Sequence, residues 1–344
     1  MVTIRNEMRR VMGGFATHAI FGKEILEENA DILPVTAIRK HLGIFGAGCQ
    51  GPDLFLYNIP MLLSSKEKNL GIRMHNEGSS RYFAYLMQVI LEASDVPAVE
   101  VGLSYLYGAL AHYTLDSMIH PYVYAKIGYN AESPCSKQAT NGLHHRLESA
   151  IDARMIAVKE DKLPSVYSAA QSQQMTRQEK KLLAEYLSEV VSRSYRIKLK
   201  KENVMASLKM MRIITSGFFA ASSAQRRRLQ KIEWPFCEDY GLSNFMVTDD
   251  LIQKRKVMNS KNSIWHNPWD KRIASSASVW EIFNQAAVRY RQYCLLLGKA
   301  LPSYRNGFYM IMGEGADWKE NQRKIARAAM GLGNLSYDSG LPLK

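Results

Sequence analysis

Cysteine is scarce in this sequence, and the cysteines present are far apart. Among 344 residues there are four, Cys49, Cys135, Cys237 and Cys294, and no two form a Cys-x-x-Cys pair. This spacing argues against a zinc knuckle and against a disulfide scaffold. It is typical of free thiols in a reducing compartment.

Long apolar runs are also lacking. The longest uncharged stretch falls short of the roughly 18 to 20 residues that a membrane span needs. The basic start of the chain, MVTIRNEMRR, is not followed by an apolar segment of signal-peptide length. We therefore expect a protein without a transmembrane segment that stays in the cytoplasm.

Positive charge is abundant, but only in one half of the chain. Hydrophobic residues make up 47% and charged residues 22%, as in an ordinary folded protein. The net charge is +13, yet residues 1–160 hold 15 Lys and Arg against 16 Asp and Glu, whereas residues 161–344 hold 30 against 16. The second half therefore predicts a phosphate-bearing partner, which could be nucleic acid, an anionic lipid surface or a phosphorylated small molecule.

The stretch from 101 to 120, VGLSYLYGALAHYTLDSMIH, predicts one buried helix that ends near Pro121. His112, Asp116 and His120 follow one another at steps of four residues, which places all three side chains on one face. Buried imidazoles and a carboxylate are costly unless they are paired or bound to a metal. The pattern fits a set of metal ligands, and satisfied core histidines are the alternative.

A second run of the same kind is GLHHRLESAID, at residues 142–152. His144 and Glu148 are four residues apart, and Asp152 lies one turn further along the same stripe. His145 points about 100° away from that stripe. We therefore predict that His144, and not His145, shares a metal with Glu148.

Three further candidates lie in the first half of the chain. His18 falls in the first turn of a helix predicted over residues 15–30 with Thr17 as its cap. Asp53 follows a glycine-rich segment, residues 42–60, that we expect to be irregular, and an acid there is either a helix cap or a ligand. His75 lies in a short polar run before a helix. Because seven of the eight histidines lie in the first 145 residues, a site with several metal ions is favoured over separate core histidines.

The second half predicts helices near residues 177–195, 202–214, 219–232, 276–299 and 318–331, and residues 122–142 and 160–180 are expected to be loops. Few alternating strand patterns are present, so the predicted fold is all-α. We divide it into a metal-binding helical domain, residues 1–160, and a basic helical region, residues 161–344, packed on the first. A basic cluster, formed by Arg226, Arg227, Arg228 and Lys231, is either a phosphate contact or a solvated helix face. Trp265, His266 and Trp269 predict an aromatic loop packed against the first half.

The constellation resembles the zinc-dependent phospholipase C family, which shares its fold with fungal single-strand-specific nucleases. The most specific pieces are HYTLD at 112–116 and HHRLESAID at 144–152, and the resemblance covers roughly residues 12–155. It implies a helical bundle that holds two or three zinc ions, here with a helical extension at the C-terminal end. The implied ligands are His18, Asp53, His75, His112, Asp116, His120, His144 and Glu148.

The resemblance also implies how these ligands divide among three ions. Asp53, His75, His112 and Asp116 would hold the first, and His18 and Asp116 the second, with Asp116 bridging. The third would be held by His120, His144 and Glu148.

The sequence departs from the family pattern in two places. Secreted members use the amino and carbonyl groups of an N-terminal Trp as a zinc ligand, whereas here His18 follows a segment without Trp. The step from Asp116 to His120 is four residues, where the secreted enzymes have six.

Hydrolysis of a phosphodiester by a zinc-activated water is the reaction that such a site implies. Asp53 is either a ligand or the group that accepts a proton from the attacking water. The expected substrate is a phospholipid or a similar phosphodiester. A single-strand nuclease on the same metal site, or an inactive zinc-binding protein that binds a partner, are the alternatives.

Overall fold

The helices of this protein surround one long, buried helix. The computed structural model describes residues 14–58, 70–132, 136–237, 241–301 and 318–343. The helices of the first half are α2 (Phe15–Glu28), α3 (Val35–Lys40), α4 (Leu42–Cys49), α6 (Leu70–Asn76), α7 (Ser79–Leu91), α8 (Val96–Lys126) and α9 (Ser136–Lys159). Those of the second half are α10 (Arg177–Tyr195), α11 (Lys201–Ala220), α12 (Ser223–Cys237), α13 (Val279–Ala300) and α14 (Trp318–Gly331). The fold is all-α, as predicted.

A small hairpin, which we did not predict, interrupts the helices of the second half. Strand β1 (Trp265–Asn267) pairs antiparallel with β2 (Asp270–Ser275), and the register shifts between His266 and Asn267. The three-residue β1 is too short to show an alternating pattern, which is why the sequence did not indicate it.

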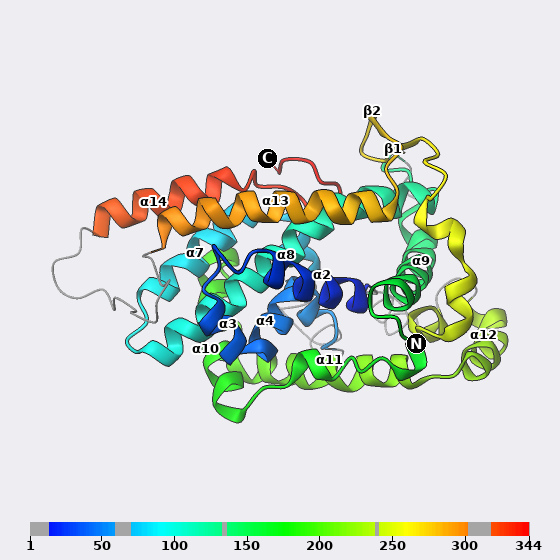
Figure 1. Ribbon diagram of the computed structural model, residues 1–344, viewed down its shortest axis with the longest axis horizontal. Coiled ribbons are helices and arrows are strands. Elements are labelled where there is room, and N and C mark those ends of the chain that lie inside the picture. The colour runs from blue at the N-terminus through cyan, green and yellow to red at the C-terminus, as the bar shows by residue number, and fades with distance from the viewer. Residues whose placement is uncertain (1–13, 59–69, 133–135, 238–240, 302–317, 344) are drawn as a thin grey trace.

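Helix α8 is the central element. Its start is specified locally, because the side chain of Asp95 accepts a hydrogen bond from Ala98 N–H at 2.8 Å and Pro97 lies in the first turn. Side chains on all sides of the helix are buried, as expected of a helix inside a large core. It contacts α2, α3, α4, α7, α9, α10, α13 and β1, and Figure 1 shows α13 along one side of this centre and α10 and α11 along the opposite side.

The predicted end of this helix at Pro121 is wrong, because α8 continues to Lys126. Proline has no N–H, so the carbonyl of Ser117 loses its partner inside the helix. The chain near the C-terminus packs on this carbonyl: Gly340 has φ of +65°, and a Cβ there would collide with Ser117 O. Tertiary packing therefore stabilises a helix through a residue that usually ends one.

The expectation of an irregular segment at residues 42–60 is also wrong for its first part, which forms α4 followed by a 3-10 helix at Gly51–Phe55. The glycines of α4 provide close approach. A Cβ on Gly48 would collide with the backbone of α8 at Tyr105, and one on Gly43 or Gly46 with the backbone of residues 172–174. Burial on two sides therefore outweighs the low helix propensity of glycine.

The second half packs directly on the first. Tyr290 of α13 donates a hydrogen bond to Tyr107 O at 3.2 Å, and Tyr113 donates one to Leu332 O at 2.8 Å. Buried residues from both halves form one hydrophobic cluster. The division into two domains at residue 160 stays a prediction.

Among the described residues, no single helix is long and apolar enough to cross a bilayer. Helices α11 and α12 reach the length and apolar composition of a membrane span only when they are taken together, and they are bent by 104° at the break between them.

Candidate metal centre

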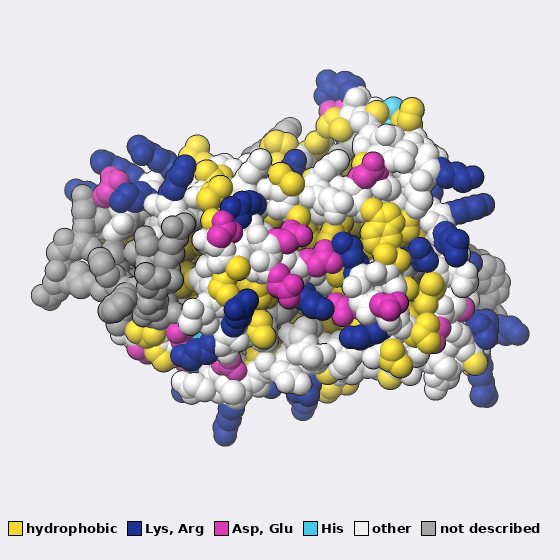
Figure 2. Space-filling view, viewed as in Figure 1, with side chains coloured by type: hydrophobic (Ala, Val, Ile, Leu, Met, Phe, Trp, Pro, Cys, Tyr) yellow, Lys and Arg dark blue, Asp and Glu magenta, His cyan; other side chains and the backbone are white. Residues whose placement is uncertain are grey.

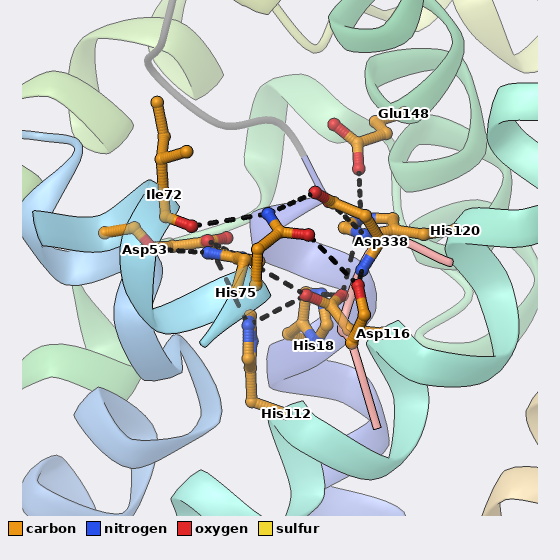
Figure 3. A network of polar contacts seen from close by, with 12 residues as sticks. His18, Asp53, Ile72, His75, His112, Asp116, His120, Glu148 and Asp338 are labelled. Atoms are coloured by element: carbon orange, nitrogen blue, oxygen red, sulfur yellow. Dashed lines mark hydrogen bonds and ion pairs between the residues drawn. The ribbon is translucent and has the colours of Figure 1, made fainter. Parts of the chain in front are cut away.

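Asp116 lies at the middle of the cluster of predicted ligands (Figure 3). Its Oδ1 is 3.0 Å from His18 Nε2 and 3.5 Å from His120 Nε2. Its Oδ2 is 2.9 Å from His112 Nε2 and 3.6 Å from His75 Nε2. Histidines from three helices, α2, α6 and α8, therefore point at one carboxylate that is completely buried.

The structure brings all eight predicted ligands together, in three groups whose ligand atoms lie within 4.8 Å of one another. His112 belongs to two of them. The groups are His18, His112 and Asp116; Asp53, His75 and His112; and His120, His144 and Glu148. Each contains at least one imidazole and a carboxylate, which is the donor set of a Lewis-acidic zinc site.

Local contacts aim two of the histidines inward. The Nδ1–H of His75 donates to Gly71 O at 2.7 Å, one turn earlier in α6. His112 Nδ1 makes the equivalent contact, at 3.1 Å, with Cys49 O at the end of α4. In both cases a backbone carbonyl fixes the ring, so that Nε2 points into the cluster.

The second carboxylate, Asp53, lies in the 3-10 helix that follows α4 and is buried. Its Oδ1 is 3.0 Å from His75 Nε2 and 4.0 Å from His112 Nε2. The structure therefore places Asp53 beside the histidines and does not use its side chain as a helix cap.

His144 and His145 separate as the helical register predicts. His144 Nε2 is 3.0 Å from Glu148 Oε1, and His120 Nε2 is 3.2 Å from the same oxygen. His145 Nδ1 is further, 3.7 Å from Glu148 Oε2, and its ring packs on Phe245 at a centroid distance of 4.4 Å. Glu148 Oε1 is therefore shared by His144 and His120.

Opposing effects act on the ionisation of the cluster. Burial alone raises the pKa of the Asp116 carboxyl, but His112, His120 and His18 outweigh it and hold that pKa well below its usual range. Burial likewise lowers the pKa of His120, and Asp116 with Asp338 and Glu148 outweighs burial and raises it well above normal. For His112, burial dominates and the pKa is lowered. The electrostatics thus favour an ionised Asp116 beside a protonated His120, so a cation that binds at His120 would displace a proton.

The residues fit a set of metal ions, because many buried polar atoms of the cluster lack a hydrogen-bond partner. Within the described part of the chain these atoms are His18 Nδ1, Asp53 Oδ1, His75 Nε2, His112 Nε2, both oxygens of Asp116, His120 Nδ1, both ring nitrogens of His144 and Glu148 Oε2. Buried polar atoms are normally satisfied, and leaving so many unsatisfied would cost several kcal/mol. Coordination to a cation would satisfy the atoms that face inward.

Helix α2 is held in place by α9, which corrects one expectation. Thr17 is not the cap: the helix begins at Phe15, and Gly14 precedes it with φ of 79°. Asp152 of α9 caps it instead, accepting hydrogen bonds from Ala16 N–H at 3.1 Å and from Thr17 N–H and Oγ1–H at 2.8 and 2.6 Å. One stripe of α9 therefore has two roles. His144 and Glu148 contribute candidate ligands, and Asp152 holds the start of the helix that carries His18.

Sequence reasoning missed the contribution of the C-terminal segment. Tyr337 is buried, and its ring lies 5.1 Å from that of His75 and 5.7 Å from that of His112. Asp338 Oδ1 is 3.6 Å from His120 Nδ1. More than 200 residues separate this segment from the central helix, and no local pattern around Tyr337 or Asp338 signals the contact.

The aromatic segment is confirmed to pack on the first half, whereas the basic cluster that begins at Arg226 differs from the prediction. Trp269 packs on Tyr124 at 4.9 Å, and Tyr124 packs on His144 at 4.7 Å, so the aromatic segment does contact the first half. Arg226 is buried and its Nη2 is 2.8 Å from Asp250 Oδ2. The prediction of a solvated helix face is therefore wrong for Arg226, because this side chain is buried and Asp250 neutralises its charge.

Comparison with known proteins agrees with this geometry. A family model described as zinc dependent phospholipase C matches residues 17–197. None of the curated proteins or solved structures compared with the chain matches it. The family match covers just over half of the chain and includes all eight residues that converge on the cluster. The protein belongs to the zinc-dependent phospholipase C family.

Proposed function

We propose that this protein is a zinc-dependent phosphodiester hydrolase of the phospholipase C type. The observation that carries the proposal is the position of Asp116, whose two oxygens face histidines of all three ligand groups. A carboxylate in this position can bridge neighbouring cations. Membership of the family supports the same conclusion.

Two or three zinc ions per chain are proposed, held by the eight ligands in their three groups. When bound, zinc supplies hydroxide at neutral pH and neutralises charge on the phosphoryl oxygens. The chain's own part is to fix the imidazoles and to exclude water, since each of the eight side chains is at most 7% exposed.

Asp53 is the proposed catalytic carboxylate. Its Oδ1 is close to His75 Nε2, without hydrogen-bond geometry, and is free to bind a cation or to accept a proton from the attacking water. Substitution by Asn separates the two roles. Loss of zinc indicates a ligand, whereas retained zinc with lost turnover indicates a proton acceptor.

A phospholipid is the proposed substrate, and basic side chains support contact with an anionic lipid surface. On α14, Lys319, Arg323 and Arg327 follow one another at steps of four residues, so they form one stripe. All three are exposed, and Trp318 and Met330 add exposed apolar groups at the two ends of the helix. Figure 2 shows Lys and Arg side chains gathered over this end of the molecule, at the upper left.

The same charges also favour the first alternative, a nuclease that acts on single strands, because a basic stripe attracts any phosphate backbone. The burial of all eight ligands favours the second alternative, a zinc-stabilised protein without turnover, since structural zinc sites are closed to solvent. Direct assays separate the three functions.

The test uses the purified protein with vesicles that mix phosphatidylcholine with an anionic phospholipid and with single-stranded DNA, each with and without a chelator. Release of a phosphorylated head group that is lost with chelator and in Asp53→Asn supports the proposal. Cleavage of DNA that falls steeply between 50 and 200 mM salt would instead identify a nuclease. Tightly held zinc without turnover on either substrate would overturn the enzymatic function.

A further inference from the structure

The segment near the C-terminus is built into the metal centre. Tyr337 N–H donates to His75 O at 3.0 Å, which joins the segment to α6 directly beside a ligand. Asn76, the next residue of α6, donates from Nδ2 to Asp338 Oδ2 at 2.8 Å and accepts from Ser336 Oγ at 3.1 Å. These contacts place Asp338 beside the cluster (Figure 3).

The position of Asp338 is specified by its own turn. Ser336 Oγ accepts hydrogen bonds from Asp338 N–H and from Ser339 N–H, both at 3.2 Å. Gly340 then adopts φ of +65° against the carbonyl of Ser117 in α8, a conformation and a close approach that favour glycine. The carboxylate is therefore fixed by backbone contacts on two sides, and its side chain is only 21% exposed.

His120 lacks the second contact that His75 and His112 possess. Those two rings have Nδ1 within hydrogen-bond distance of the backbone carbonyls of Gly71 and Cys49. His120 Nδ1 has no hydrogen-bond partner among the described residues, and the group that faces it is Asp338 Oδ1, 3.6 Å away. A movement of roughly half an ångström would bring the two atoms to hydrogen-bond length.

We propose that Asp338 is a positioning residue of the metal centre. Its carboxylate accepts the Nδ1–H of His120, fixes the tautomer of that ring, and so keeps Nε2 directed at Glu148 and His144. Metal-binding histidines commonly donate their second N–H to a carboxylate in this way. Because Asp338 lies outside residues 17–197, the part that matches the family, the centre of this chain is completed by a segment beyond the matched region. The inference rests on the zinc site of the proposed function.

The test measures zinc and not hydrolysis. Zinc per chain and competition with a chelator of known affinity are measured for wild type, Asp338→Asn, His120→Ala and the double variant. We expect Asp338→Asn to weaken one zinc by about 10- to 100-fold. In the His120→Ala background, Asp338→Asn should cause no further loss, because a positioning residue acts only through the ring that it orients.

Asp270→Asn is the matched control, since Asp270 is as exposed as Asp338 but pairs with Arg272 outside the cluster, so its substitution should leave zinc affinity unchanged. Circular dichroism of the zinc-free variants checks that each one folds. The inference is overturned if Asp338→Asn binds every zinc as tightly as wild type, or if it weakens zinc equally with and without His120. If wild type binds no zinc, the proposed function fails together with this inference.

Discussion

Asp116 is the central residue of the candidate metal centre, because it is the group that histidines of all three ligand sets face. Its neighbours His112 and His120 lie one turn before and after it on α8, a spacing that the sequence shows directly. The shared face of these three side chains could be predicted from the sequence, since residues four apart lie on one face of a helix whatever the rest of the fold is.

The choice between His144 and His145 is the sharpest prediction at the scale of single residues. His144→Ala should release one zinc, because His144 Nε2 lies 3.0 Å from Glu148 Oε1. His145→Ala should retain all zinc and lose only the packing of its ring on Phe245. Zinc per chain in the two variants checks this. Loss of zinc in His145→Ala with retention in His144→Ala would show that the assigned register is wrong.

Asp338 could not be predicted from the sequence. It has no periodic relation to another ligand, and it reaches His120 only because the chain returns to α8 after more than 200 residues. Contacts between distant segments of this kind depend on the tertiary fold and leave no local pattern.

At the scale of elements, most helices of the second half were predicted within a few residues. In the first half, α4, α6, the continuation of α8 beyond Pro121 and the start of α9 were not predicted. Pro121 lies inside α8, and the glycines of α4 lie inside a helix, in both cases because close packing outweighs local propensity. The exceptions lie next to the cluster. The carbonyl at the end of α4 contacts His112, and the chain near Gly340 packs beside Pro121.

Because α4 packs closely on α8, we predict that one added methyl group between them lowers the stability of the protein. Gly108→Ala should destabilise the protein by about 1–3 kcal/mol, because its Cβ would collide with the carbonyl of Phe45. Gly217→Ala in α11 is the control: nothing lies within 4 Å of its Cβ, so the gain in helix propensity should stabilise by up to about 1 kcal/mol. Urea unfolding measures both, and equal effects of the two substitutions would contradict the packing argument.

Because Asp152 caps α2, we predict that the stability of the folded protein depends on pH through this carboxyl. Burial outweighs the three hydrogen bonds that Asp152 accepts and raises the pKa of its carboxyl to about 6. A raised pKa stabilises the folded state below the ordinary pKa near 3.8, and this contribution is lost as the pH rises through about 6. Asp152→Asn keeps an acceptor but does not titrate.

We therefore expect the free energy of unfolding of zinc-free wild type to fall, relative to that of Asp152→Asn, by roughly 2.4 kcal/mol between pH 4 and pH 7. Urea unfolding of both proteins over this range measures the difference, in which the other titrating groups cancel. Parallel stability curves for the two proteins would show that the carboxyl titrates in its ordinary range.

At the scale of the whole molecule, the metal centre lies inside a single hydrophobic cluster to which both halves contribute. Candidate ligands from α2, α6, α8, α9 and the 3-10 helix after α4 meet there. The difference in charge between the two halves was evident from composition. Its arrangement was not, because pairs such as Arg226 with Asp250 form only in the folded chain.

The most direct test of the account is zinc per chain in the purified protein, without added metal, beside Asp116→Asn. The account predicts two or three zinc ions in the wild type and loss of most of them in the variant, since Asn cannot bridge cations as a carboxylate does. A folded wild type that holds no zinc, or a variant that holds as much as the wild type, would contradict the account.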